Sequence, residues 1–162
     1  MPNSTTTIRD FDILQQLKNL IPALGPAYTQ PIEAIGNSSI GDHIRHLLEF
    51  YQCLFEAIEK GVEVDYESRK RSVSIASQPE VALLAIDHLH QNLIQIIEDQ
   101  PLRVQGVPSS LGRELQYAFD HAVHHCALIK AGLFFLDLKH LVPDDFGVSP
   151  STIRYRNGQV VL

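Results

Sequence analysis

The sequence predicts an all-α fold, an antiparallel four-helix bundle formed by a single domain of 162 residues. Three observations predict it. Four long segments repeat apolar residues every three or four positions, which is the spacing of one helix face. Segments with the alternating pattern of a strand are short and few. The length is enough for a core without disulfide or metal staples, and 44% hydrophobic residues are typical of a globular chain.

The first two helices have clear ends in the sequence. Residues 8–24 carry the apolar positions of the first helix, and the Gly-Pro pair at residues 25–26 ends it. The second helix begins at Ser38 or Ser39, because either hydroxyl can accept a backbone N–H bond as the cap. It ends at Gly61, which follows a lysine and suits a left-handed C-terminal residue.

The third and fourth helices follow after a polar stretch. Pro79 suits the first turn of the third helix, which runs to about residue 99. The fourth helix is capped by Ser109 or Ser110 and runs to about residue 136 or 138. Between these two helices, residues 102–107 have weak strand character.

The connections are longer than those of minimal up-down hairpins, and the C-terminal tail is extended. Residues 62–78 are polar and charged without a helical stripe, so a short strand or turn is expected there. The tail after Pro143, which includes residues 146–156, is expected to be loop-like. The alternation at residues 154–156 is typical of an extended segment, and a terminal strand is expected over residues 159–162.

Composition excludes several classes of protein. A net charge of −6 argues against a general nucleic-acid binder, which needs a basic face. No stretch approaches the roughly 20 apolar residues that span a bilayer, and the polar start is no secretory signal. We therefore expect a cytoplasmic protein in which Cys53 and Cys126 are reduced and act as small core residues. The domain is expected to comprise residues 1–162, with residues 1–7 and about 157–162 peripheral.

Five of the eight histidines fall in two tight clusters. His43 and His46 lie three residues apart in the second predicted helix, and His121, His124 and His125 lie in the fourth. Residues three or four apart share a helix face, so His121 and His125 can aim at one point, whereas His124 is rotated away from it. Both clusters are expected to border the interior of the bundle.

A shared metal ion is one interpretation of these clusters. Neighbouring buried imidazoles each need a partner, because burying an unpaired polar group costs roughly 1–3 kcal/mol. Imidazole suits zinc, nickel, copper and iron. The alternative is a metal-free bundle with core histidines bonded to carbonyl groups. That interpretation, or simple surface exposure, is favoured for His88, His90 and His140.

Several motifs of known chemistry are absent. The sequence His-Glu-x-x-His does not occur, because Ala122 occupies the glutamate position, so no helix-borne general base of the zincin kind is present. No Glu-x-x-His pair exists, which argues against a ferritin-like di-iron site. Neither a P-loop nor a glycine-rich dinucleotide fingerprint is found.

The histidine motifs resemble those of the DinB-like superfamily, which includes proteins of the bacillithiol-transferase type. Proteins of that family have a Ser-Ile-x-x-x-x-x-His-Leu pattern on the second helix. Residues 39–47 of this chain resemble that pattern. The family also has His-x-x-x-His on the last long helix, with a His-His-x-x-x-Ile ending that "HHCALI" resembles. The resemblance implies a four-helix bundle in which His46, His121 and His125 bind a divalent metal. It selects His46 rather than His43 as the ligand from the second helix.

The resemblance also implies a class of activity. Members of the superfamily are similar to thiol S-transferases or metal-dependent hydrolases of small molecules, and a homodimer is expected. Zinc or nickel is the expected ion, with open positions for water or the thiol of a low-molecular-weight substrate. The resemblance assigns no catalytic residue. His43 and His124 are candidates for residues that contact the metal-binding histidines, or for alternative ligands. Glu49 and Asp120 can orient a ligand imidazole, the alternative being solvated acids on a helix face.

Two arginines in the charged connection are candidates for holding substrate. If residues 64–72 fold over the mouth of the bundle, Arg69 or Arg71 can bind an anionic group through both guanidinium nitrogens. The alternative is a solvated charged loop. The rival to an enzyme is a non-catalytic module that binds metal structurally, senses a ligand or dimerises through a helical face.

Overall fold

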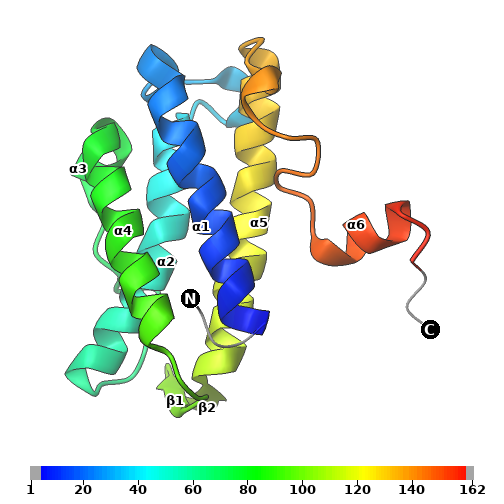
Figure 1. Cartoon of the computed structure of the whole chain (residues 1–162). Helices are drawn as coiled ribbons and strands as arrows, with labels where there is room; N and C mark the ends of the chain where they lie inside the picture. Colours follow the sequence, from blue (N-terminus) through cyan, green and yellow to red (C-terminus); the bar gives the residue numbers. More distant parts are fainter. Residues whose placement is uncertain (1–4, 160–162) are drawn as a thin grey trace.

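Four long helices lie side by side in the computed structural model, which describes residues 5–159 (Figure 1). Helix α2 packs against α4 and α5, and α1 packs against the same two helices, so the four axes enclose one core. In the described residues, no helix combines the length and apolar character needed to cross a membrane. The long helices are α1 (Thr5–Leu24), α2 (Ile40–Lys60), α4 (Pro79–Gln95) and α5 (Leu111–Phe135).

The other elements in residues 5–159 are short. Two further α-helices and one two-stranded antiparallel sheet complete the described chain, with single 3₁₀ turns between some elements. The structure is therefore mostly helical with a small sheet. These short elements are α3 (Val73–Ser77), β1 (Pro101–Val104), β2 (Val107–Ser110), α6 (Pro150–Arg156) and the 3₁₀ turns η1 (Gly25–Tyr28), η2 (Glu33–Ile35) and η3 (Lys139–Leu141).

The core is built from the apolar stripes that the sequence predicts. Each long helix turns one such stripe inward, and Leu17, Leu47, Ile86 and Ile129 are fully buried members from α1, α2, α4 and α5. Burying a side chain of this size contributes roughly 1.5–3 kcal/mol. The four stripes therefore hold α2 and α5 against each other, and these are the two helices that carry the histidine clusters.

Helix α2 is fixed at both ends. Of the two candidate caps, Ser39 begins the helix: its Oγ accepts a hydrogen bond from the Asp42 backbone N–H at 3.0 Å, and the Asp42 carboxylate accepts one from the Ser39 N–H at 3.0 Å. This reciprocal pair satisfies two N–H groups that the helix leaves free. Gly61 ends the helix with φ of 63°, as predicted.

Helices α2 and α4 run in the same direction, so the helices are not all antiparallel to their neighbours. Their starts are adjacent, because a Cβ on Gly41 in α2 would lie 2.2 Å from the carbonyl oxygen of Ala76, just before α4. Their ends are also adjacent: Val64, after α2, donates its N–H to the carbonyl of Arg103 in β1, which follows α4. A long connection must therefore run back between them.

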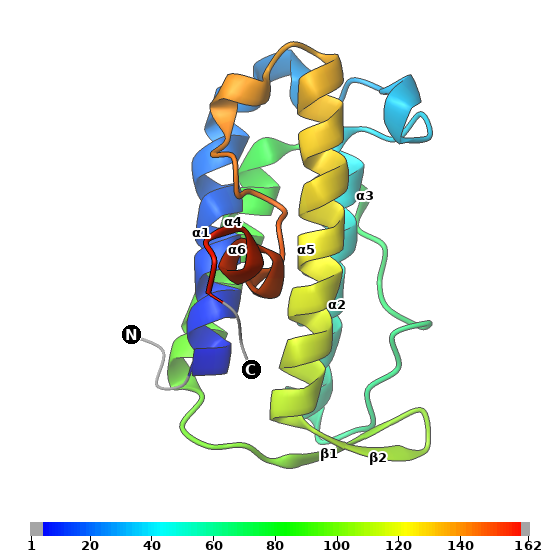
Figure 2. The same ribbon diagram turned by 90° about the vertical axis from the view of Figure 1, so that its right-hand side faces the viewer.

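That connection, residues 61–72, runs back beside α2 towards α3 (Figure 2). The Cys53 thiol lies 3.3 Å from the Asp65 carbonyl oxygen, and the Tyr66 ring stacks on the Phe50 ring with centroids 5.1 Å apart. A short strand or turn is predicted for residues 62–78, and the regular structure there consists of the isolated bridge at Val64 and the short helix α3. This course brings charged residues of the connection to the histidines of α2.

Two helix ends differ from the prediction. Helix α1 already begins at Thr5 and Thr7 is buried, so residues 5–7 are not peripheral. Helix α4 ends at Gln95 rather than near residue 99, because the chain turns extended at Ile96. Asp99 is then free to accept the backbone N–H of Gly112 at 2.7 Å, which ties this crossing to the start of α5.

A hairpin stands where the sequence showed only weak strand character. Val104 pairs with Val107, and Gln105 and Gly106 form the two-residue turn between them, both with positive φ. Such a turn favours glycine, and it matches the twist of the two strands. Ser110 ends β2 and also caps α5 by accepting a hydrogen bond from the Arg113 N–H, so it is the cap among the two predicted serines.

The tail contains a helix, so the extended segment expected at residues 154–156 is wrong. Ser149 caps α6 and Pro150 occupies its first turn. Figure 1 shows α6 outside the four long helices, and Figure 2 shows it on the side of α1 and α5. Phe146 is buried and seats the tail on the core. Of the terminal strand expected over residues 159–162, residues 160–162 lie outside the described residues, and Gln159 is not in a strand.

Candidate metal centre

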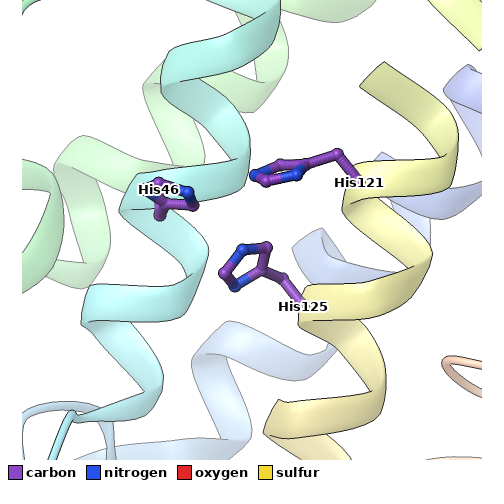
Figure 3. Close-up of side chains that lie close together, drawn as sticks. All are labelled: His46, His121 and His125. Atoms are coloured by element: carbon purple, nitrogen blue, oxygen red, sulfur yellow. The ribbon is translucent and has the colours of Figure 1, made fainter. Parts of the chain in front are cut away.

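Three histidine side chains converge in the space between α2 and α5. His46 comes from α2, and His121 and His125 come from α5, one turn apart (Figure 3). Each offers a ring nitrogen, and these three nitrogens all lie within 4.8 Å of one another. The structure thus brings together the three histidines that the family resemblance implies. A divalent ion binds imidazole nitrogens at about 2.0–2.1 Å, so small ring rotations suffice for one ion to reach all three.

The electrostatics keep these imidazoles neutral. Partial burial lowers the pKa of His46 to about 4, with further lowering by His121 and Arg69. Burial and the neighbouring histidines lower the pKa of His125 to about 3. The pKa of His121 is also lowered, mainly by burial. Its Nε2 is buried without a hydrogen-bond partner among the described residues. Neutral rings with an unused nitrogen are what a metal ion requires.

His43 lies directly behind the cluster. Its Nδ1 is 2.9 Å from Nδ1 of His125, so one ring donates a hydrogen bond to the other. The nitrogens of His43 do not belong to the group of three that lie within 4.8 Å. His124 is exposed, as its rotated position predicts, and meets His125 edge-on with centroids 5.4 Å apart. His43 therefore has the geometry of a residue that orients a ligand.

Glu49 is buried, so the interpretation as a solvated acid is wrong for it. Its side chain is 1% exposed. Oε1 accepts the backbone N–H of Ser72 at 2.7 Å, and the carboxylate lies 3.8 Å from Arg45 Nε and 3.5 Å from Arg69 Nε. Glu49 thus ties the end of the long connection to α2, and it reaches the histidines through Arg69 rather than by touching a ring.

Asp120 is an exposed acid on the helix surface. Its Oδ1 accepts a hydrogen bond from Gln116 Nε2 at 2.9 Å. That interaction runs along the outer face of α5, one turn apart, and not towards the ring of His121. The structure therefore supports the interpretation as a solvated acid for Asp120.

Arg69 contacts the cluster, whereas Arg71 does not. Nη2 of Arg69 lies 3.1 Å from Nδ1 of His46, and its guanidinium lies over the ring of Phe50, 5.0 Å from the centroid. Arg71 is exposed, and its side chain has no ion pair or hydrogen bond with the residues that the structure describes. Of the two predicted anchors, only Arg69 is placed beside the histidines.

An aromatic wall adjoins the cluster, and sequence reasoning did not identify it. The rings of Phe50 and His121 have centroids 4.0 Å apart, and Phe50 also packs against Tyr66 and Tyr117. Tyr66 donates its hydroxyl hydrogen bond to the buried carboxylate of Glu114 at 2.8 Å. The position of Phe50, one helical turn after His46, was the sequence signal that could have placed its ring beside the cluster. No local pattern places Tyr66 there.

The remaining histidine and cysteine candidates have ordinary environments. His90 is buried, stacks on Phe11, and its Nε2 lies 3.1 Å from the Phe11 carbonyl oxygen, which confirms it as a core histidine. His88 and His140 are exposed. Cys126 is fully buried, and burial raises the pKa of its thiol.

A pocket lies on the side of the long connection, and none of the three histidines lines it. It has a volume of about 240 Å³ and lies between α2 and residues 62–70. Glu49, Cys53 and Arg69 are among its lining residues. Because Arg69 both lines this pocket and contacts His46, it connects the pocket to the histidine cluster.

Comparison with known proteins gives little guidance. No family model matches the chain, and no solved structure matches it. A stretch of 47 residues is 51% identical to FK506-binding protein 5 of Rhizopus delemar. The stretch covers 29% of this chain and 12% of that protein, so the chain spans only a small part of this relative. A match of this extent shows no family.

Proposed function

We propose that this chain is a divalent-metal-dependent enzyme of the DinB-like type, a thiol S-transferase or a hydrolase acting on a small molecule. His46, His121 and His125 would hold the ion. The four long helices support a four-helix bundle of that type, with α2 and α4 parallel. Zinc and nickel are the ions that we propose, because both bind neutral imidazole well.

One observation carries the proposal: three neutral imidazoles from two helices meet within 4.8 Å, and a buried nitrogen of His121 has no partner in the described residues. An unpaired buried nitrogen costs roughly 1–3 kcal/mol, and an ion removes that cost. Core histidines usually find a carbonyl instead, as His90 does with Phe11. The cluster thus contrasts with an ordinary histidine in the same core.

The number and exposure of the ligands favour chemistry over a structural role. Structural zinc sites are closed by four protein ligands, whereas three ligands leave a position for solvent or substrate. His46, His121 and His125 are each only partly buried, so a small molecule can approach them. When bound, a divalent ion lowers the pKa of water towards about 7 and deprotonates a thiol.

The protein's own groups define how the site is held. His43 orients His125 through the contact between their Nδ1 atoms at 2.9 Å. Packing of Phe50 against the ring of His121 limits its rotation. Such contacts raise affinity, because a ligand that is already oriented loses little freedom when it binds the ion.

The test is metal content after purification. The wild-type protein should contain about one zinc or nickel ion per chain by elemental analysis. Both His46→Ala and His121→Ala should reduce this content at least tenfold, because two imidazoles cannot replace three. His88→Ala serves as the matched control, since His88 is an exposed histidine of α4 away from the cluster, and it should leave the content unchanged.

Undiminished metal in both cluster variants would rule out the site. If the metal is present, the activity is tested with a low-molecular-weight thiol and an aryl chloride, and separately with ester and amide substrates. Turnover that disappears in His121→Ala identifies the reaction class. Absence of turnover together with a full metal complement would favour the non-catalytic metal-binding module.

A further inference from the structure

Arg69 is held in place by three different contacts. Nη1 donates a hydrogen bond to the Tyr66 carbonyl at 2.9 Å, Nε lies 3.5 Å from the Glu49 carboxylate, and the guanidinium covers the ring of Phe50. Its side chain is 12% exposed. An arginine so restrained loses little entropy when it binds a further group. Its remaining nitrogen, Nη2, points at the histidine cluster.

The contact between Nη2 of Arg69 and Nδ1 of His46, at 3.1 Å, is incompatible with a metal ion on His46. An arginine nitrogen only donates, so Nδ1 must offer a lone pair. If the ion binds Nδ1, it takes that lone pair. If the ion binds Nε2, the neutral ring carries its proton on Nδ1, and two donors face each other. In both cases Arg69 loses its acceptor.

A metal-loaded centre would therefore contain a nearly buried guanidinium with an unused donor. Leaving it unpaired is costly. The charge balance points the same way, because a divalent ion would add positive charge beside Arg69, whose carboxylate partner Glu49 is shared with Arg45, itself also paired with Asp42. An acceptor that also carries negative charge would satisfy both conditions.

We propose that Arg69 binds an oxyanion of the substrate, a carboxylate or a phosphate group, next to the metal centre. This inference rests on the proposed function and names the class of substrate for the same site. The planar guanidinium fork matches both groups. A pocket of about 240 Å³ that Arg69 lines offers space for an uncharged or cationic remainder of the molecule, because Glu56, Glu63 and Asp65 also line it.

The neighbouring cations do not have this geometry. Lys70 is 81% exposed and lies 3.5 Å from Glu56 on the surface. Arg71 is exposed and forms no ion pair with the described residues. The proposal is therefore specific to Arg69, and Arg71→Gln removes the same charge nearby without touching the centre.

The experiment uses the full chain loaded with Co²⁺, whose visible absorption reports ligands added to the centre. Acetate and inorganic phosphate are titrated as probes of the two oxyanion classes, and imidazole is titrated as a neutral ligand that does not need a cationic partner. Wild-type and Arg71→Gln proteins should bind at least one of the two oxyanions, and the tighter of the two identifies the class. Arg69→Gln should weaken that binding at least tenfold and change the imidazole affinity less than twofold.

Arg69→Lys keeps the charge without the fork and should show an intermediate loss, and it serves as the test if Arg69→Gln does not fold. Oxyanion binding that is unchanged in Arg69→Gln, or absent from the wild type, overturns the role of Arg69 while Co²⁺ binding still supports the metal centre. Failure of the wild-type chain to bind Co²⁺ overturns the metal centre and this inference together.

Discussion

At the scale of single residues, spacing indicates which histidine rings can meet but not what surrounds them. The separation of His121 from His125 by one helical turn indicates that these two rings share a face, whereas His46 was selected over His43 only by the resemblance of the histidine motifs to a known family. The sequence slightly favours a solvated acid over an orienting one for Glu49, and this is wrong because the connection packs on Glu49 and buries it. Periodicity within α2 contains no information about a segment that packs on it from elsewhere.

Another buried acid, Asp10, lies in the core and gives a prediction for pH dependence. Asp10 is 0% exposed and accepts a hydrogen bond from the Tyr51 hydroxyl at 2.6 Å, while its Oδ2 has no donor among the described residues. Burial raises its pKa from 3.8 to about 7. The folded state therefore binds a proton that the unfolded chain releases, and stability contributed by Asp10 falls as the pH rises from about 4 to 7.

Asp10→Asn should remove this dependence, because asparagine resembles the protonated acid at every pH. Relative to wild type, the variant should gain stability as the pH rises, by up to about 4 kcal/mol near pH 8. Urea unfolding of both proteins from pH 4 to 8 measures the difference. Asp12→Asn, an exposed acid on the same helix, is the control and should show no such trend. A constant difference between Asp10→Asn and wild type would contradict the prediction.

At the scale of elements, local capping signals were more informative than alternation. The Ser-Pro pair at residues 149–150 is a helix start, yet the alternation in residues 154–156 was interpreted as extended. Gly106 marks the hairpin turn, and it was the available signal for the second strand. Helix type was predictable wherever a long apolar stripe existed. Short elements such as α6, which has no buried residue, lack that signal.

The seating of the tail on α5 gives a prediction at this scale. Gly147 has φ of 70°, and a Cβ there would lie 2.5 Å from the Ala127 backbone nitrogen. Gly147→Ala therefore combines backbone strain with a clash that cannot relax through a side chain. We expect a loss of about 2–3 kcal/mol in the free energy of unfolding, measured with urea.

Gly158→Ala is the matched control for the tail. Gly158 has φ of 71°, nearly the same, but no atom lies within 4 Å of its added Cβ. It should cost only the strain, about 1 kcal/mol or less. Equal losses in the two variants would show that the contact between the tail and α5 contributes nothing to stability.

At the scale of the whole molecule, the four long helices were predicted from the sequence, but the expected antiparallel arrangement is wrong for α2 and α4. The parallel pair α2 and α4 follows from residues 61–72, which return along α2 instead of turning tightly. Contacts of that connection, such as Arg69 with His46 and Tyr66 with Phe50, join residues 16 or more positions apart. No local pattern specifies such pairings. The site residues that come from the connection therefore could not be placed from the sequence.

The proposed metal centre should link ion binding to the stability of the whole fold, because α2 and α5 bring the three histidines together only in the folded chain. An ion present at 100 times its dissociation constant should raise the free energy of unfolding by about 2.7 kcal/mol, and the gain should disappear in His125→Ala but persist in His140→Ala, an exposed histidine. The same site gives a prediction for pH, because the pKa of His46 is about 4 and that of His125 about 3. The ion therefore meets unprotonated ligands well below pH 6.5, whereas the metal-free protein loses stability as the pH falls below 6.5, since the unfolded histidines take up protons first. Thermal unfolding with and without Zn²⁺ at pH 7.5 and 5.5 should show the gain at both values, and a gain confined to pH 7.5 would contradict a site built from these lowered pKa values.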